Sequence, residues 1–187
     1  MKITTGIIKD ILIIEPDVHG DHRGFFLETW NRQNYETAGI IDDFVQDNLS
    51  YSGRGTLRGL HFQITRPQAK LVQVISGEVF DVTVDIRPGS PTFGKWEGFF
   101  LSSENHRQLF IPGGFAHGFC VTSEFAYFHY KCSSFYDPQD EGGILWSDPD
   151  LGIEWPCEHP IISEKDMRLQ KLSKLAPSQL YQPDRSS

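Results

Sequence analysis

Two histidines stand where an imidazole can do chemistry. His61 lies in the mostly apolar segment 56–63, beside the cation Arg58 and beside Gly59, which removes side-chain bulk. His117 follows a Pro- and Gly-rich turn and opens a second apolar segment. A lone histidine in such a segment is equally well a core residue bonded to a backbone carbonyl. Two together indicate the wall of a pocket.

The two histidine segments resemble the paired motifs of the cupin superfamily, which consists of small double-sheet β-barrels. The second motif, Pro-x-Gly-x-x-His, is present as Pro112, Gly114 and His117. Metal-binding cupins carry His-x-His in the first motif and a Glu soon after, whereas here His61 is followed by Phe and Gln. A Zn, Fe or Mn site needs at least three suitable protein ligands. We therefore expect no metal and no other cofactor, which disfavours a cupin oxygenase.

The segments that must position these histidines have the sequence pattern of short strands. Runs rich in Val, Ile, Phe, Tyr and Thr alternate with Gly and Pro, the pattern of many antiparallel strands. The clearest run is 70–86, where Ser76 and Gly77 predict a tight hairpin turn. Further strands are expected at 55–63, 94–101, 107–111, 118–121 and 125–132. Their short spacing predicts an all-β fold, a double-sheet antiparallel jelly-roll barrel of the cupin type.

Helical signals are confined to the margins of the chain. Residues 31–38, closed by Gly39, and the turn 163–166 predict short peripheral helices. Strands and helices do not alternate, which excludes a Rossmann sheet. A chain of 187 residues fits one domain. We expect residues 1–187 to form a single domain whose tail, from about residue 176, is loosely ordered.

Composition excludes several classes of function. The net charge of -8 argues against a protein that binds nucleic acid by neutralising phosphates. Apolar runs are too short to span a bilayer, and the first 16 residues lack the pattern of a signal peptide. Cys120, Cys132 and Cys157 are odd in number and too widely spaced for a disulfide framework. We expect a cytoplasmic protein with no membrane and no nucleic-acid partner.

Blocks along most of the chain resemble the dTDP-4-dehydrorhamnose 3,5-epimerase family. They follow the family's order from about Lys2 to Asp166, which is far more specific than any single motif. The blocks are 23–26, 44–48, 57–63, 68–72, 90–96, 114–119, 130–132, 146–149 and 163–166. The resemblance implies a metal-free homodimer with exchanged N-terminal strands. It also implies inversion of C3 and C5 of dTDP-4-keto-6-deoxy-D-glucose, on the route to dTDP-L-rhamnose.

The implied reaction needs groups on two sides of the sugar. A proton next to a ketone is weakly acidic, so its removal needs a base, and the enolate oxygen needs a hydrogen bond or charge. Inversion then needs a proton from the opposite face. By resemblance, His61 is the base, Asp166 orients it, and Tyr130 is the acid across the pocket.

Strand alternation gives partial support for these roles. It places Tyr130 on the same face as Phe128. Lys70 shares a predicted face with Val72, where a charge is unusual without a partner or ligand. Lys70 is therefore the candidate for stabilising the enolate oxygen, and Asp81 on the expected second hairpin arm is a possible partner for it.

Two questions stay open at this point. Asp81 competes with Asp166 as the carboxylate behind His61. Plain alternation also places Arg58 and His61 on opposite faces of one strand, although both are expected near the ligand. Gly59 is a candidate bulge that re-aims one of them. Alternatively, Arg58 serves a neighbouring subunit's site.

The nucleotide end of the expected substrate needs cations and hydrogen-bonding groups, and bidentate arginine suits phosphate. By resemblance the substrate-binding residues are Arg23, Glu28, Gln46, Asp47, Asn48, Arg58, His117, Glu141 and Lys165.

Two other functions are compatible with this fold. Close relatives invert only C3 or only C5, and their His base does not separate them from a 3,5-epimerase. A non-catalytic cupin that binds sugar nucleotides would lack the base or the acid, whereas His61 and Tyr130 are both present. The sequence leaves open the choice of nucleotide base, the acceptor of the final sugar and any stable contact with a downstream reductase.

Overall fold

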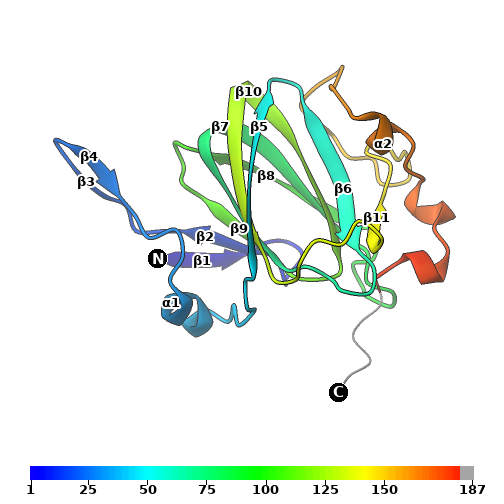
Figure 1. Ribbon diagram of the computed structural model, residues 1–187, viewed down its shortest axis with the longest axis horizontal. Helices are drawn as coiled ribbons and strands as arrows, with labels where there is room; N and C mark the ends of the chain where they lie inside the picture. Colours follow the sequence, from blue (N-terminus) through cyan, green and yellow to red (C-terminus); the bar gives the residue numbers. More distant parts are fainter. Residues whose placement is uncertain (182–187) are drawn as a thin grey trace.

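The computed structural model describes residues 1–181, in which antiparallel strands are the main regular structure (Figure 1). The strands are β1 (Lys2–Thr5), β2 (Leu12–Glu15), β3 (His19–Asp21), β4 (Gly24–Phe26), β5 (Gln46–Gly53), β6 (Leu57–Gln63), β7 (Lys70–Asp85), β8 (Trp96–Ser102), β9 (Gln108–Ile111), β10 (Phe115–Cys132) and β11 (Glu141–Gly143). The short helices are α1 (Arg32–Thr37) and α2 (Glu164–Met167), with the 3-10 turns η1 (Leu172–Lys174) and η2 (Pro177–Gln179).

Two long strands, β7 and β10, pair with each other and create the two layers of the barrel. The first part of β7 pairs with β9 and its second part with β8. The first part of β10 pairs with β6 and its second part with β5. Each long strand therefore passes from one layer into the other. One layer follows the order β1-β2-β9-β7-β10-β5, and the other β8-β7-β10-β6-β11. The expected all-β, antiparallel double-sheet fold is confirmed.

The expected hairpin in 70–86 is wrong, because β7 is continuous. Gly77 has φ +89 and a Cβ there would lie 2.0 Å from the carbonyl oxygen of Phe125. The strand stays paired with β10 on both sides of Gly77, with register shifts at this point. Ile75 is therefore an extra residue in β7, and residues 122–125 of β10 stand against the single residue Glu78, so these irregularities carry both strands between the layers. For the same reason 118–121 and 125–132 belong to one strand, β10.

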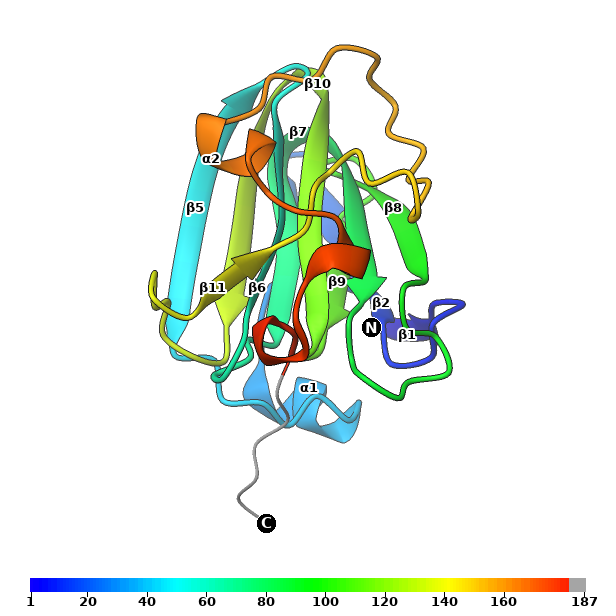
Figure 2. The ribbon, with the colours of Figure 1, turned by 90° about the vertical axis from the view of Figure 1, so that its right-hand side faces the viewer.

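Three apolar clusters stabilise the fold. The first lies between the two layers and includes Val72, Val79 and Phe128. In the second, the outer face of the β8 to β11 layer is covered by the C-terminal segment, which contributes Leu172 and Leu180 (Figure 2). In the third, α1 packs against β9 and the first part of β7. Helix α1 has Asn31 as its N-cap and ends before Gly39, as predicted.

The C-terminal segment departs from the expectation of loose order. Leu180 is only 9% exposed and belongs to the second cluster, so the chain is packed at least as far as this residue. Residues 182–187, the rest of the tail in that prediction, lie outside the described residues. No helix in residues 1–181 is both long and apolar enough to cross a membrane.

Asp85 ends β7 and anchors the loop that follows. Its carboxylate, which is fully buried, accepts hydrogen bonds from Arg87, Ser90 and Thr92. Burial alone would raise the pKa of Asp85, but these donors lower it from 3.8 to about 2. A carboxyl with a lowered pKa stabilises the folded state above its unfolded pKa, and this stabilisation fades as the pH falls toward the folded value.

We predict that Asp85→Asn lowers the free energy of unfolding by about 2 kcal/mol at pH 7, the equivalent of this pKa difference. The gap between variant and wild type should narrow as the pH drops below about 4, where the unfolded carboxyl becomes protonated. Urea unfolding followed by tryptophan fluorescence at several pH values measures this. A gap that is the same at pH 7 and pH 3 would contradict the assignment.

Candidate active site

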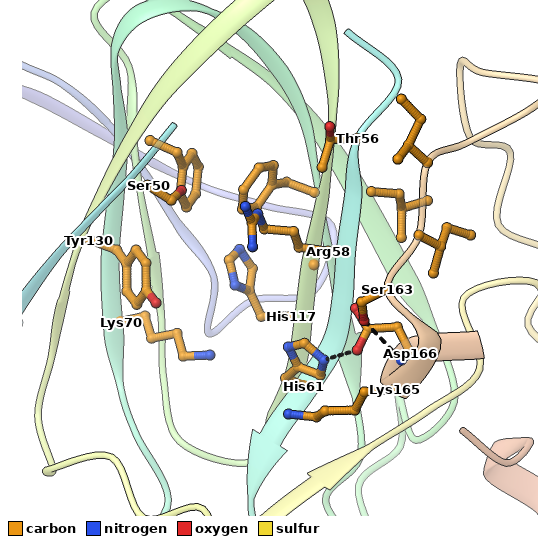
Figure 3. A pocket seen from close by; sticks show the side chains of 16 residues that line it. Ser50, Thr56, Arg58, His61, Lys70, His117, Tyr130, Ser163, Lys165 and Asp166 are labelled. Atoms are coloured by element: carbon orange, nitrogen blue, oxygen red, sulfur yellow. Dashed lines mark hydrogen bonds and ion pairs between the residues drawn. The ribbon is translucent and has the colours of Figure 1, made fainter. Parts of the chain in front are cut away.

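A cavity of about 500 Å³ opens between the two layers of the barrel and receives both histidines (Figure 3). His61 comes from β6 and His117 from β10. The cavity wall also contains Arg58, Lys70 and Tyr130. The sequence-based expectation of a pocket wall is confirmed for both segments.

His61 is held by Asp166 from α2, 105 residues further along the chain. His61 Nε2 and Asp166 Oδ1 are 2.7 Å apart, and the Asp166 side chain is only 4% exposed. Asp166 also accepts a hydrogen bond from the Gly59 amide, and its own amide donates to the Ser163 hydroxyl, the N-cap of α2. Burial alone would raise the pKa of Asp166, but the hydrogen bond and charge of His61 hold it below its usual value. Asp166 is thus an ionised partner that fixes the ring through Nε2.

The competition between Asp81 and Asp166 is resolved by geometry. Asp81 Oδ2 lies 2.8 Å from His117 Nε2, with both side chains buried. Each histidine in the cavity therefore has its own carboxylate. Asp166 belongs to His61, and Asp81 belongs to His117.

The bulge predicted at Gly59 is present. His61 lies opposite His117 and Arg58 lies opposite Phe119, so β6 has one residue more than β10 between these pairs. Gly59 has φ +115, in the region that favours glycine. The bulge turns Arg58 and His61 toward the same cavity, which plain alternation does not allow.

Lys70 and Tyr130 face His61 from the other side of the cavity (Figure 3). Lys70 is 9% exposed, and burial lowers the pKa of its ammonium. Burial raises the pKa of Tyr130, so its hydroxyl keeps its proton at neutral pH. Tyr130 shares its face of β10 with Phe128, as alternation predicted.

Smaller cavities continue past His61 and Tyr130. They are lined by Gln46 and Asn48 from β5 and by Glu141 from β11. Glu141 Oε1 lies 3.9 Å from His61 Nδ1, and Glu141 Oε2 accepts hydrogen bonds from Lys165 Nζ at 2.5 Å and from the Tyr136 hydroxyl at 2.8 Å. Burial alone would raise the pKa of Glu141, but these two donors lower it. The polar groups predicted around the ligand are thus continuous with the main cavity.

Three of the residues predicted to bind substrate do not reach the cavity. Arg23 is exposed in the β3–β4 hairpin and pairs with Asp21. Glu28 is exposed and accepts hydrogen bonds from two asparagines near α1. Asp47 points outward and pairs with Lys131. In Figure 1 the hairpin projects away from the barrel, so Arg23 cannot reach the cavity of its own chain.

Several cavity residues were missed in the sequence. Phe119 and Phe128 stack with ring centroids 4.2 Å apart and form an apolar part of the wall. Phe119 follows His117 by two residues in a strand, so alternation predicts that the two side chains share a face. Tyr136 lies in the loop before β11, where no periodicity marks it.

The arrangement can remove and add protons on opposite sides of a bound molecule. An oriented imidazole faces a protonated phenol, with an ammonium between them, which suits proton transfer next to a carbonyl group. Among residues 1–181, no three His, Cys, Asp or Glu side chains are grouped so that they could hold a metal ion. A reaction that needs no metal ion stays a prediction from the sequence.

Comparison with known proteins gives a consistent result. A family model described as dTDP-4-dehydrorhamnose 3,5-epimerase matches residues 5–174. The chain is similar to the dTDP-4-dehydrorhamnose 3,5-epimerase of Shigella flexneri, with 56% identity over 173 residues, 91% of this chain and 96% of the relative. The enzyme of that name from Pseudomonas aeruginosa is 55% identical over 168 residues, 89% of this chain and 93% of the relative.

A solved structure agrees with these sequences. It is the dTDP-6-deoxy-D-glucose-3,5-epimerase of Legionella pneumophila in complex with dTDP-4-keto-L-rhamnose. It matches with a TM-score of 0.94 and 50% identity, and covers 97% of this chain and 98% of that one.

The bulge in β6 leads to a stability prediction. A Cβ at Gly59 would lie 2.6 Å from Gly118 Cα and 2.7 Å from the His117 carbonyl oxygen. We expect Gly59→Ala to lower the free energy of unfolding by about 4 kcal/mol, because backbone strain and overpacking add. Gly55→Ala is the matched control, since Gly55 has φ +78 and open space around it. It should cost about 1 to 2 kcal/mol from backbone strain alone. If urea unfolding shows the same loss of free energy of unfolding in both variants, the tight bulge at Gly59 is contradicted.

Proposed function

The chain belongs to the dTDP-4-dehydrorhamnose 3,5-epimerase family, and we propose that the His61 cavity is the active site of this reaction. The chain is an isomerase that converts dTDP-4-keto-6-deoxy-D-glucose into dTDP-4-keto-L-rhamnose by epimerisation at C3 and C5. The observation that carries the assignment of the site is the placement of His61 and Tyr130 on opposite sides of one cavity (Figure 3).

His61 Nδ1 takes the proton from the carbon next to the C4 ketone. Asp166 holds Nε2 and balances the charge of the imidazolium that forms. The electrons move to the C4 oxygen, where the Lys70 ammonium stabilises the enolate. Tyr130 then donates its proton to the carbon from the opposite face, which inverts it. Exchange with solvent restores His61 and Tyr130 before the second carbon reacts.

The nucleotide end of the substrate extends away from His61 into the smaller cavities. We place Gln46, Asn48 and Glu141 there, because they line that space. Arg58, His117 and Lys165 supply donors at the main cavity. Asp47 is left out, since its carboxylate faces outward. We also propose a cytoplasmic location, as expected from the sequence.

We propose a homodimer in which Arg23 and Glu28 complete the site of the other copy. The β3–β4 hairpin carries exposed Phe25 and Phe26, 63% and 66% exposed, away from the barrel (Figure 1). The outer faces of β5, β7 and β10 also expose an apolar patch. It consists of Leu49, Tyr51, Ile75, Phe125 and Tyr127. A second copy that covers this patch would bring its hairpin alongside the first chain.

Isotope exchange tests the two catalytic roles. The protein is incubated with dTDP-4-keto-6-deoxy-D-glucose in deuterated water, and deuterium at C3 and C5 is followed by NMR. Wild type should exchange and invert both carbons. His61→Ala should lose exchange at both, because no base remains. Tyr130→Phe should keep slow exchange without inversion, since a proton can return only from the His61 side. The turnover rate of each variant should fall on the order of 10²- to 10⁴-fold.

The control is His159→Ala, at the surface and outside the cavity. It should behave as wild type. Exchange at one carbon only would make the chain a mono-epimerase. No exchange at either carbon would favour a binding protein, and full inversion by Tyr130→Phe would exclude Tyr130 as the acid.

Subunit complementation tests the shared site. Arg23→Ala and His61→Ala should each be strongly impaired as homodimers. Co-expression forms mixed dimers in which one of the two sites is intact, so activity should return to about a quarter of wild type for random pairing. Activity no greater than the sum of the two homodimers would show that Arg23 acts within its own chain or not at all.

A further inference from the structure

Asp81 is a buried carboxylate that the proposed reaction does not yet use. It lies within β7 and is 0% exposed. Its Oδ2 is bonded to His117 Nε2 at 2.8 Å, whereas Oδ1 is buried without a hydrogen-bond partner among residues 1–181. A buried carboxylate with one oxygen unsatisfied is costly unless nearby positive charge compensates it.

One group that can carry positive charge contacts Asp81, and a second is near enough for the charge of Asp81 to raise its pKa. His117 reaches it from β10, and Lys70 shares β7 with it and extends into the same cavity (Figure 3). On the other side, the residue of β8 opposite Asp81 is Phe99, whose side chain is uncharged. Asp81 is therefore the negative charge behind the two nitrogen groups of this wall.

We propose that Asp81 is a positioning residue for the reaction. Its carboxylate orients the His117 imidazole toward the cavity and provides the negative charge that keeps the Lys70 ammonium protonated there. This inference deepens the proposed function and rests on it for the role of Lys70 at the enolate oxygen.

The charges around Lys70 set the direction of the effect. Burial lowers the pKa of Lys70, and Cys132, Asp81 and Glu141 oppose this. Cys132 lies opposite Lys70 on β10 and its own pKa is raised by burial, so it is a neutral thiol at neutral pH. Glu141, on β11, is already paired with Lys165 and Tyr136. Removing the charge of Asp81 should therefore lower the pKa of Lys70 further.

Chemical labelling tests this without relying on catalysis. Each lysine is acetylated with acetic anhydride over a range of pH, and the extent of modification is read by mass spectrometry. Asp81→Asn keeps the side-chain shape and an acceptor for His117 but removes the charge. The midpoint of Lys70 labelling should fall by about one pH unit, the size of effect that a nearby opposite charge has. Lys131, which pairs with Asp47 outside the cavity, should keep its midpoint.

The matched control is Asp85→Asn. Asp85 is also on β7 and fully buried, but its partners are Arg87, Ser90 and Thr92. The Asp85→Asn variant should leave the pH midpoint of Lys70 labelling unchanged. An unchanged midpoint in Asp81→Asn would overturn the proposal. If wild type fails to exchange deuterium, the proposed function fails, while the labelling shift still decides the electrostatic role.

Kinetics separates positioning from a purely structural role. In Asp81→Asn, kcat should fall on the order of 10²-fold with a smaller change in KM, because the loss affects the charged intermediate. The alkaline limb of the pH profile should move to lower pH, since Lys70 loses its proton earlier. A wild-type alkaline limb would contradict the link to Lys70.

A second variant covers the case in which Asp81→Asn does not fold. Lys70 would then be a buried cation that has lost a compensating charge. Lys70→Met with Asp81→Asn removes both charges and should recover the folded state, measured by circular dichroism and urea unfolding. If the double variant is no more stable than Asp81→Asn alone, the two residues are not coupled and the proposal fails.

A separate observation concerns two cysteines that the chemistry of the cavity does not use. Cys120 is buried on β10, and Cys157 is half-buried in the segment between β11 and α2. Their sulfur atoms lie 3.2 Å apart although the residues are separated by 37 positions. Four residues further on, Ile161 bonds through its backbone to Gly55 and Leu57 and lines the cavity.

The geometry points to Cys120 and Cys157 as a thiol–disulfide site for low-molecular-weight disulfides such as oxidised glutathione. The more exposed Cys157 thiolate attacks the disulfide and releases one glutathione thiol. The Cys120 sulfur, after losing its proton to solvent, attacks Cys157 and releases the second. Two protein thiols are oxidised and one glutathione disulfide is reduced. Burial raises the pKa of Cys120 to about 12, so the second step is faster at alkaline pH.

Peptide mapping tests this site. The protein is incubated with oxidised glutathione at neutral and alkaline pH, blocked with iodoacetamide and digested without reductant. A cross-linked peptide that joins Cys120 to Cys157 is expected, faster at alkaline pH and absent in Cys157→Ser. Cys132→Ser should not affect it. A stable glutathione adduct on Cys157 without the cross-link, or no reaction at either residue, would overturn the proposal.

Discussion

The hydrogen bond between His61 and Asp166 is the interaction on which the site depends. It joins β6 to α2 across 105 residues of sequence. Asp166 reaches His61 because the C-terminal segment wraps over the outer face of one layer, with Leu172 and Leu180 packed into the second apolar cluster. Ser163 caps the short helix that presents Asp166. The energy of apolar packing on the outside of the barrel thus fixes the orientation of one ring inside it.

The continuity of β7 and β10 explains how so many functional groups meet in one cavity. Each strand crosses from one layer to the other, so its two parts line the cavity from different sides. In β7 these parts carry Lys70 and Asp81, and in β10 they carry Tyr130 and His117. A hairpin in place of β7 would give two shorter strands that lack this crossing. The irregular pairing of β7 with β10 on either side of Gly77 is therefore a feature on which the site depends.

Local sequence signals predicted strand segments within β6 to β10, the two helix starts, the shared face of Tyr130 and Phe128, and the bulge at Gly59, but not β1 to β5 or β11. Family resemblance supplied the roles. The sequence could not show that β7 continues through Ser76 and Gly77, because turns and irregular strands use the same residue types. Nor could it assign carboxylates to histidines, since those pairs join segments 36 and 105 residues apart. Contacts of that range are set by the packing of layers, which no local periodicity encodes.

The most direct test of the central claim is a crystal structure of the His61→Asn variant with dTDP-4-keto-6-deoxy-D-glucose bound. The account predicts that the sugar lies between residue 61 and the Tyr130 hydroxyl, with the C4 oxygen within hydrogen-bond distance of Lys70 Nζ. The nucleotide should extend toward Gln46 and Asn48. A sugar with residue 61 and Tyr130 on the same face, or one bound outside this cavity, would contradict the account.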